Sequence, residues 1–340
     1  MRLGWRTYPL RLREPLRISR STMPGRDAAQ VDLTHDGVTG HGEVVTSVYY
    51  GLDLATIVEL LAGLRHRVRD YGEPEALLAN LPALAAELPA GVLAALDAAV
   101  HDLLARRAGT PLHRWLGRPA PPAVATAHTI GLVGPDHAAT TARALTRRGF
   151  QLVKVKCGDA ADLARVAAVR AAMPAARLVI DPNGAWTAEQ TVRLLDALRP
   201  HGIDAVEQPI APGTPRLLAW ISARTDVPVI ADEDAATLAH LDALAGTVAG
   251  INVKLPKCGG IHAARQITAA ASALGLDLML GCLVASSLGI APAVHLTGTA
   301  RWIDLDGHLL LTDDPWTGIG GHDGVLRLPD EPGLGVRAVR

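Results

Sequence analysis

Aromatic residues and cysteines are scarce in this chain of 340 residues. Aromatic residues make up 3% of the sequence, and there are three cysteines. Cys157, Cys258 and Cys282 are widely spaced and odd in number, so they predict neither a zinc site nor a set of disulfide bonds. Because free thiols persist in a reducing compartment, we expect a cytoplasmic protein.

The chain also lacks an excess of charge of either sign and any long apolar run. Its formal net charge is −1, with acidic and basic residues interspersed, so we expect no nucleic-acid partner. No stretch of about 18 residues is apolar enough to cross a bilayer, so we expect no membrane association. The segment from Met1 to Leu16 is Arg-rich without an apolar core and does not resemble a signal peptide.

A strand–helix alternation fills the middle of the sequence. Eight strand candidates lie at 125–130, 152–156, 178–181, 204–207, 228–231, 251–254, 278–282 and 302–305, with helical patterns such as 187–198 and 261–274 between them. This alternation predicts a parallel α/β barrel. A doubly wound sheet is the competing architecture, but its G-x-G-x-x-G phosphate fingerprint after the first strand is absent.

The first third of the chain has a different pattern. Residues 1–50 alternate between strand and turn signals, residues 52–116 have helical periodicity, and a Pro-rich segment follows at 118–123. We therefore expect an α+β domain at 1–117 and the barrel at 118–310. We expect the segment 311–340 to return to the first domain.

Polar residues recur at the ends of successive strand candidates. Lys156, Asp181, Glu207, Asp232 and Lys254 are separated by 22 to 26 residues, about one strand plus one helix each time. Catalytic groups in a parallel barrel lie at the carboxyl ends of its strands. The sequence therefore predicts a ring of acids with a lysine on either side, a site suited to hold a cation and move a proton.

The three acids of this ring predict a metal site. Asp181, Glu207 and Asp232 are hard oxygen ligands with no nearby His or Cys, a set that favours Mg²⁺, or Mn²⁺ as an alternative, over zinc. One acid alone would be interpreted as a cap of the following helix. Three in register, flanked by lysines, favour the metal site.

The lysines predict acid–base chemistry. Lys154 and Lys156 share one face of their strand, and like charge is expected to lower the pKa of both toward that of a base. Lys254 lies on the sixth strand, across the barrel from the second, so Lys156 and Lys254 are expected to reach one carbon from opposite sides. The alternative interpretation is that an inward lysine is an ion-pair partner for a barrel acid.

The chain resembles the enolase superfamily, in particular its muconate-lactonising branch. The resemblance implies a (β/α)7β TIM-like barrel with an α+β N-terminal capping domain. It also implies that Lys156 and Lys254 are the acid–base pair, that Lys154 supports Lys156 and the substrate carboxylate, and that the three acids bind Mg²⁺. The matching motifs are Gly40-His41-Gly42-Glu43, Lys154-Val155-Lys156, Asp181-Pro182-Asn183, Glu207-Gln208-Pro209, Ala231-Asp232-Glu233 and Asn252-Val253-Lys254.

Within that branch the end of the barrel resembles the dipeptide epimerases. Asp304-Leu305-Asp306 matches the Asp-x-Asp that in this family holds the α-ammonium of the substrate, and Thr129, Cys282 and Val284 match positions lining the same pocket. The alternative is that Asp304 and Asp306 only form a turn before Gly307.

Met23 bears on the choice of dipeptide. Epimerases of Ala-Glu dipeptides carry an Arg at this place, so Met23 predicts a small or apolar second residue in the substrate. Arg26 lies on the same loop as a substitute cation.

The function expected from this resemblance is a Mg²⁺-dependent epimerisation of L,L- and L,D-dipeptides by two-base 1,1-proton transfer at the α-carbon of the C-terminal residue. The alternatives on the same site are o-succinylbenzoate synthase, muconate cycloisomerase and N-acylamino acid racemase. A non-catalytic metabolite-binding barrel is an interpretation of another class. A homo-oligomer is also expected.

Overall fold

A computed structural model describes residues 1–117 and 123–339. The chain begins with an antiparallel sheet of β1 (Arg2–Ile18), β2 (Ser21–His35) and β3 (Val38–Val45), in the order β1-β2-β3. The turn between β2 and β3 has Asp36 and Gly37 at φ 48° and 76°. Two such residues form the hairpin turn whose twist suits antiparallel strands.

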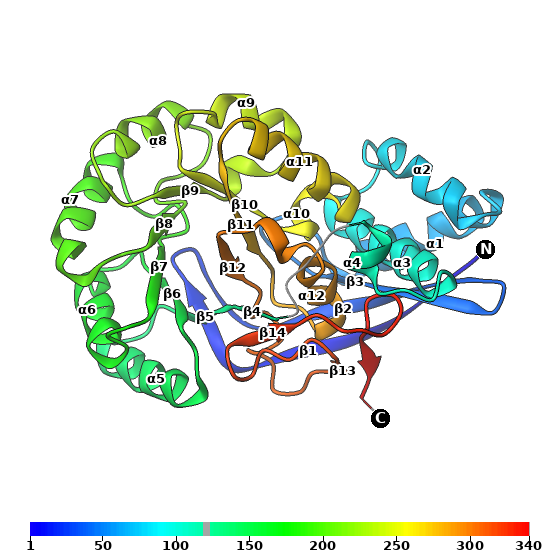
Figure 1. Ribbon diagram of the computed structural model, residues 1–340, viewed down its shortest axis with the longest axis horizontal. Helices are drawn as coiled ribbons and strands as arrows, with labels where there is room; N and C mark the ends of the chain where they lie inside the picture. The colour runs from blue at the N-terminus through cyan, green and yellow to red at the C-terminus, as the bar shows by residue number, and fades with distance from the viewer. Residues whose placement is uncertain (118–122, 340) are drawn as a thin grey trace.

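Helices α1 (Leu54–Asp70) and α3 (Ala90–Arg107) pack on one face of this sheet, and α2 (Pro74–Leu84) packs on α3 (Figure 1). Strand β3 lies directly on the backbone of α3, because a β-carbon on Gly40 or Gly42 would overlap the carbonyl oxygen of Ala99 or Ala95. These glycines permit the close approach, and they determine where the next residue on β3, Glu43, lies.

The rest of the chain is a barrel of eight parallel strands whose spatial order follows the sequence. These are β5 (Ala127–Ile130), β6 (Leu152–Lys156), β7 (Arg177–Asp181), β8 (Ala205–Glu207), β9 (Val229–Ala231), β10 (Gly250–Val253), β11 (Asp277–Gly281) and β12 (Trp302–Asp304). The predicted strands are confirmed to within one or two residues at each end.

Helices ring the outside of the strands (Figure 1). They are α5 (Pro135–Arg148), α6 (Asp162–Ala172), α7 (Ala188–Leu198), α8 (Pro215–Ser222), α9 (Leu241–Leu244), α10 (Leu255–Cys258), α11 (Ile261–Ala273) and α12 (Ser287–Val294). Thr187 and Gln190 form a capping box at the start of α7, which satisfies backbone N–H groups that have no partner within the helix.

The first and last barrel strands meet through side chains. The backbone N–H of Leu305 donates to Thr126 Oγ1 at 3.0 Å, and that of Thr129 donates to Asp306 Oδ2 at 2.6 Å. These bonds join β12 to β5 at the seam of the barrel. The predicted α/β barrel with an N-terminal α+β unit is therefore confirmed.

Inward-facing residues of the barrel form an apolar layer below a polar one. The apolar layer consists of Ala127, Leu152, Val179, Ala205, Ile230, Met279 and Trp302. Because strand side chains alternate between faces, the next inward residue on each strand lies two positions further along. On most of these strands that residue is charged. The candidate functional residues therefore lie next to a packed apolar layer, at the carboxyl ends of the strands.

The segment after the barrel contacts the N-terminal helices. Its strand β13 (Trp316–Thr317) pairs with β15 (Arg337–Ala338), and β14 (Val325–Arg327) pairs with β4 (Ala123–Ala125). Leu112 N, at the start of α4 (Leu112–Trp115), donates to Gly333 O at 2.8 Å, and Leu334 N donates to Asp102 Oδ1 at 2.7 Å. The domain boundaries remain a prediction, since residues 118–122 lie outside the described part of the chain.

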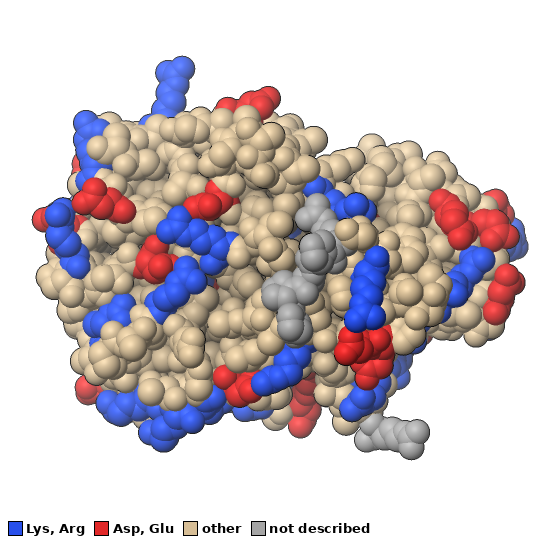
Figure 2. Space-filling model, in the orientation of Figure 1, with Lys and Arg blue, Asp and Glu red and all other residues tan. Residues whose placement is uncertain are grey.

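Acidic and basic side chains are interspersed over the face seen in Figure 2. Within residues 1–117 and 123–339, no helix is both long and apolar enough to span a membrane.

Candidate active site

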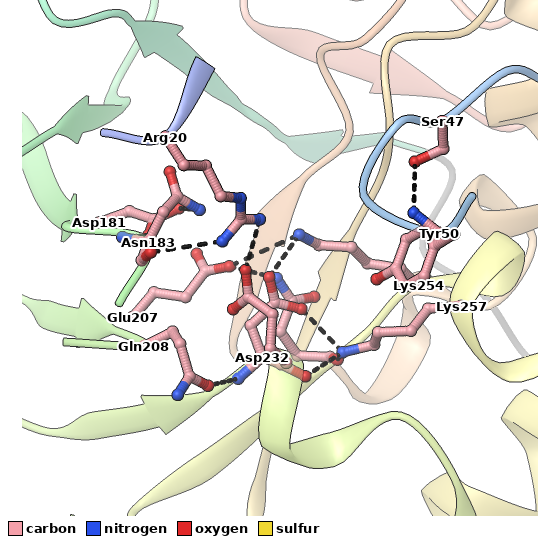
Figure 3. Close-up of polar contacts among 12 residues, drawn as sticks. Arg20, Ser47, Tyr50, Asp181, Asn183, Glu207, Gln208, Asp232, Lys254 and Lys257 are labelled. Carbon is pink, nitrogen blue, oxygen red and sulfur yellow. Dashed lines mark hydrogen bonds and ion pairs between the residues drawn. The ribbon is translucent and has the colours of Figure 1, made fainter. Parts of the chain in front are cut away.

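The predicted ring of charged residues is assembled at one end of the barrel (Figure 3). Asp181 and Glu207 end β7 and β8, while Asp232 and Lys254 directly follow β9 and β10. All four side chains are buried. Because neighbouring strands are joined in register, one polar group at the end of each strand brings the groups within ion-pair distance of each other.

Lys154 lies at the centre of the acids. Its Nζ is 2.6 Å from Glu207 Oε2, 2.9 Å from Asp304 Oδ2 and 3.0 Å from Asp181 Oδ2. Burial alone would lower the pKa of Lys154, but the three carboxylates outweigh burial and hold that pKa well above its usual range. The expectation that the lysine pair lowers the pKa is therefore wrong for Lys154, which is an ion-pair partner of the barrel acids.

The two lysines of the expected acid–base pair each contact one carboxylate. Lys156 Nζ donates to Asp181 Oδ2 at 2.6 Å, and Lys254 Nζ donates to Asp232 Oδ2 at 2.7 Å. Burial opposes charge on Lys254, yet Asp232 and Glu207 together raise its pKa. These carboxylates therefore favour the protonated form of Lys254, which is the form that can give a proton to a substrate.

Both lysines border a cavity of about 340 Å³. Its walls also include Asp232 and the predicted pocket residues Met23, Cys282 and Val284. The structure therefore brings six of the predicted site residues to one cavity. Lys154, Asp181, Glu207 and Asp304 lie buried in the charged network beneath it.

Two loops of the N-terminal domain cover this cavity: the tip of the β1–β2 hairpin, within 16–26, and the segment after β3, within 46–50. Arg20 joins both loops to the barrel. Its guanidinium lies 2.6 Å from Glu233 Oε1, donates to Asn183 O at 3.3 Å and stacks over the Tyr49 ring at 4.3 Å. The cavity is therefore closed by the first domain, although its chemistry comes from the second.

Asp304 and Asp306 are buried but do not border this cavity. Asp306 accepts from the Thr129 backbone, and Thr129 lines a separate cavity of about 190 Å³ beside β1 and α5. Burial and the neighbouring Asp304 raise the pKa of Asp306 to about 7. The assigned contact of Thr129, Asp304 and Asp306 with a substrate remains a prediction.

The three predicted metal ligands suit a hard divalent cation. Glu207 is fully buried, and burial raises its pKa to about 7 in spite of the Lys154 charge. Glu207 Oε2 is close to Lys154 but accepts no hydrogen bond of good geometry. A buried carboxylate oxygen of this kind gains from a cation, and an all-oxygen set matches Mg²⁺.

The carboxylates are turned toward lysines in this structure. Across the described residues, no group of three or more His, Cys, Asp or Glu side chains has the arrangement of a ready-made metal site. Asp181 and Asp232 each accept a short bond from a lysine, which lowers the pKa of both carboxyls although burial opposes this. Ionised carboxylates at these positions retain the chemistry required of metal ligands.

Lys257 and Asn252 also belong to the site, and the sequence interpretation assigned neither a role. Lys257 Nζ is 2.7 Å from Asp232 Oδ1 and donates to Asn252 O at 2.7 Å, while Asn252 Nδ2 donates to Glu207 Oε1 at 2.8 Å. Their spacing from Lys254 could have indicated this position: Asn252 shares the inward face of the strand with Lys254, and Lys257 lies about one helical turn after Lys254.

Family models match both parts of the chain. Residues 5–117 match the N-terminal domain of the mandelate racemase and muconate lactonizing enzymes, and residues 137–339 match the enolase C-terminal domain-like family.

Curated relatives match over nearly the full length. A hydrophobic dipeptide epimerase of Roseobacter litoralis is 34% identical, with 98% of each chain covered. An L-Ala-D/L-Glu epimerase of Bacteroides thetaiotaomicron is 30% identical, with 100% of this chain and 88% of the relative covered.

Solved structures agree with these matches. The substrate-liganded L-Ala-D/L-Glu epimerase of Bacillus subtilis superimposes with a TM-score of 0.93 at 28% identity, covering 100% of this chain and 99% of that one. The dipeptide epimerase of Enterococcus faecalis in complex with Mg and L-Leu-L-Tyr gives 0.92 at 30% identity, covering 98% of each chain. With its N-terminal α+β unit and the charged ring of its barrel, the chain belongs to the mandelate racemase and muconate lactonizing family of the enolase superfamily.

Proposed function

We propose that this protein is a Mg²⁺-dependent dipeptide epimerase that moves a proton at the α-carbon of the C-terminal residue. One observation carries the proposal: Lys156, on β6, and Lys254, after β10, reach the same cavity from strands four apart in an eight-stranded barrel. Two lysine side chains on opposite walls, one as a neutral amine and the other as an ammonium, suit removal of a proton from one face of a carbon and its return to the other. The full-length similarity to dipeptide epimerases supports this reaction.

Asp181, Glu207 and Asp232 would hold the metal ion. When bound, Mg²⁺ would supply positive charge to the substrate carboxylate and to the enediolate formed as the α-proton leaves. Relatives solved with Mg and a dipeptide support this assignment, and Mn²⁺ shares the same oxygen-ligand chemistry.

The lysines divide the proton transfer between them. Lys254 donates to the α-carbon on one face while Lys156 accepts from the other, and the roles exchange for the opposite epimer. Lys154 stays charged among three carboxylates. Its charge would favour the ionised substrate carboxylate and orient the acids around it.

Asp304 and Asp306 would receive the free α-ammonium of the dipeptide. Asp304 Oδ1 is buried without a hydrogen-bond partner, and a cationic donor would satisfy it. N-acyl and succinyl substrates lack that donor, so this pair disfavours o-succinylbenzoate synthase, muconate cycloisomerase and N-acylamino acid racemase activities.

The side chain of the C-terminal substrate residue would lie against Met23 and Arg26, which both border the cavity. Met23 predicts an apolar side chain. Arg26 provides the opposite chemistry: its Nη1 donates to Thr46 O, but its Nε is buried without a hydrogen-bond partner, and no carboxylate among the described residues pairs with it. A carboxylate on the C-terminal substrate residue would therefore lie near the Arg26 cation. The relative rates on acidic and apolar dipeptides decide whether Met23 or Arg26 determines the preference.

Deuterium incorporation from D₂O into a dipeptide library tests the proposal directly. Exchange at the α-carbon of the C-terminal residue, with both epimers formed, is expected for free dipeptides. Exchange limited to N-acyl or succinyl compounds would assign the site to another member of the branch. No exchange with any of these compounds would favour the non-catalytic interpretation. Cytoplasmic location and a homo-oligomeric state remain predictions.

A further inference from the structure

A buried carboxylate of the N-terminal domain reaches into the barrel beside the cavity. Glu43, on β3, accepts from the backbone N–H of Ser286 at 2.8 Å and from the Ser286 hydroxyl. The Tyr8 hydroxyl, on β1, donates to the same carboxylate. Glu43 is 9% exposed and forms no ion pair with any described residue, so these three donors are its main counterparts.

Ser286 is the N-cap of α12, and the chain just before it forms a wall of the cavity. Cys282, Leu283 and Val284 border the cavity, and Ala285 alone separates them from Ser286. The Glu43 carboxylate thus binds the N-cap residue of α12, two positions after Val284, the last residue of the pocket wall. Burial raises the pKa of Glu43, whereas the bonds from Ser286 and Tyr8 and the nearby helix N-terminus favour its charged form.

The pocket wall is confined on its other side as well. A β-carbon on Gly307 would overlap Leu283 O, and one on Gly289 would lie 2.6 Å from Glu43 Oε1. The wall therefore lies between Glu43 and the chain that follows Asp306, with no spare space. A small displacement of Ser286 would move Cys282 and Val284 relative to Lys254.

We propose that Glu43 is a positioning residue, through which the N-terminal domain sets the place of the 282–284 wall and hence the binding of the substrate. This inference rests on the proposed function for its kinetic consequence, and on the structure alone for the position of the wall. Gly40 and Gly42 bring β3 onto α3 and so deliver Glu43 to Ser286.

Glu43→Gln tests the proposal while keeping side-chain size. The amide oxygen can still accept from Ser286 N, but an NH₂ group replaces Oε2, the oxygen to which the Ser286 and Tyr8 hydroxyls both donate. Both hydroxyls therefore lose their acceptor. Loss of these buried hydrogen bonds predicts an increase of KM on the order of tenfold, with a smaller change in kcat. Ser286→Ala should give the same pattern.

Asp102→Asn is the matched control. Asp102 is also a buried carboxylate of the N-terminal domain. It accepts from the backbone of His41 and Leu334 and forms an ion pair with Arg106, all outside the cavity. We expect this variant to lower the melting temperature and to leave KM unchanged. A wild-type KM in folded Glu43→Gln protein, or an equal rise in KM in Asp102→Asn protein, would overturn the positioning role.

Hydrogen exchange followed by mass spectrometry separates this inference from the proposed function, because it needs no substrate. Amides of residues 282–288 should exchange about tenfold faster in Glu43→Gln than in wild-type protein, and at the wild-type rate in Asp102→Asn protein. Faster exchange in an enzyme inactive on every dipeptide would retain the role of Glu43 and reject the dipeptide reaction. Unchanged exchange at 282–288 would reject the role of Glu43 whatever the reaction.

Discussion

Lys257 Nζ lies 2.7 Å from Asp232 Oδ1, on the carboxylate oxygen that Lys254 does not use. Each oxygen of Asp232 is therefore held by a different lysine, and Asp232 cannot rotate without breaking one of these ion pairs. Residues that orient metal ligands in this way contribute to metal affinity without touching the metal.

Replacement of Lys257 should weaken the metal site. We expect Lys257→Gln to lower Mg²⁺ affinity by about 10–100-fold, while saturating Mg²⁺ restores a large part of the activity. Mg²⁺ titration of deuterium exchange activity measures this effect. An unchanged Mg²⁺ requirement would show that Asp232 is held well enough by Lys254 alone.

Removal of the metal should abolish activity. EDTA is expected to stop α-proton exchange, and added Mg²⁺ should restore it. The reason is that no side chain among the described residues replaces the double positive charge that would stabilise the enediolate. Asp181→Asn, Glu207→Gln and Asp232→Asn should each lower kcat/KM by several orders of magnitude. Full activity in a preparation shown to be metal-free by elemental analysis would contradict the mechanism.

The two lysines should differ in stereochemistry. Lys156→Ala is expected to block exchange of the α-proton from one epimer, and Lys254→Ala from the other, since each faces one side of the carbon. Exchange of purified L,L- and L,D-dipeptides in D₂O, followed by NMR, measures this for each variant. Normal epimerisation by either variant would reject the two-base scheme.

Substrate preference should report on the contacts made by both ends of the dipeptide. N-acetylation of the dipeptide should lower kcat/KM by roughly tenfold or more, because Asp304 and Asp306 would lose a charged donor. For the second residue, Met23 predicts faster turnover of Ala-Leu than of Ala-Glu. The control is Arg26→Met, which should leave Ala-Leu turnover near the wild-type value.

A strong preference for Ala-Glu would contradict the apolar prediction and assign the carboxylate to Arg26. In that case Arg26→Met should remove the preference, whereas the neutral isostere Ala-Gln should be slow in the wild-type enzyme as well.

Stability should decrease in mild acid because of buried histidines. His295 is buried, with Nδ1 accepting from His113 N and Nε2 bonded to Leu334 O, and burial lowers its pKa to about 4. The unfolded value is about 6.5, so below that pH the unfolded state binds the proton first. The free energy of unfolding should fall between pH 6.5 and 4, by about 3 kcal/mol for a full shift of this size.

His295→Gln isolates this contribution, since an amide can both donate and accept at the same place without taking up a proton. Urea unfolding at pH 7, 5.5 and 4.5 should show a smaller loss of stability in the variant than in the wild type. An equal loss in both proteins would indicate that other groups, such as His128, account for the acid sensitivity.

The sequence by itself determined the strands, their order and the face that carries the chemistry. Lys154, Asp181 and Glu207 follow from an alternation with period two within strands and a repeat of about 25 residues between strands. Both are local properties, and parallel strands joined by helices have few other ways to pack. The inward direction of these residues could therefore be predicted without knowledge of their partners.

Only the tertiary structure decided which charged side chains contact one another. The raised pKa of Lys154 depends on three carboxylates from β7, β8 and the end of β12. These carboxylates raise the pKa and burial lowers it, and the spacing of residues in the sequence does not show which effect is larger. Asp306 turns to the Thr129 backbone because closure of the barrel places the last strand beside the first. Glu43 reaches Ser286 across 243 residues because two domains pack together. Such contacts depend on distances between elements far apart in the chain, and side-chain alternation contains no information about them.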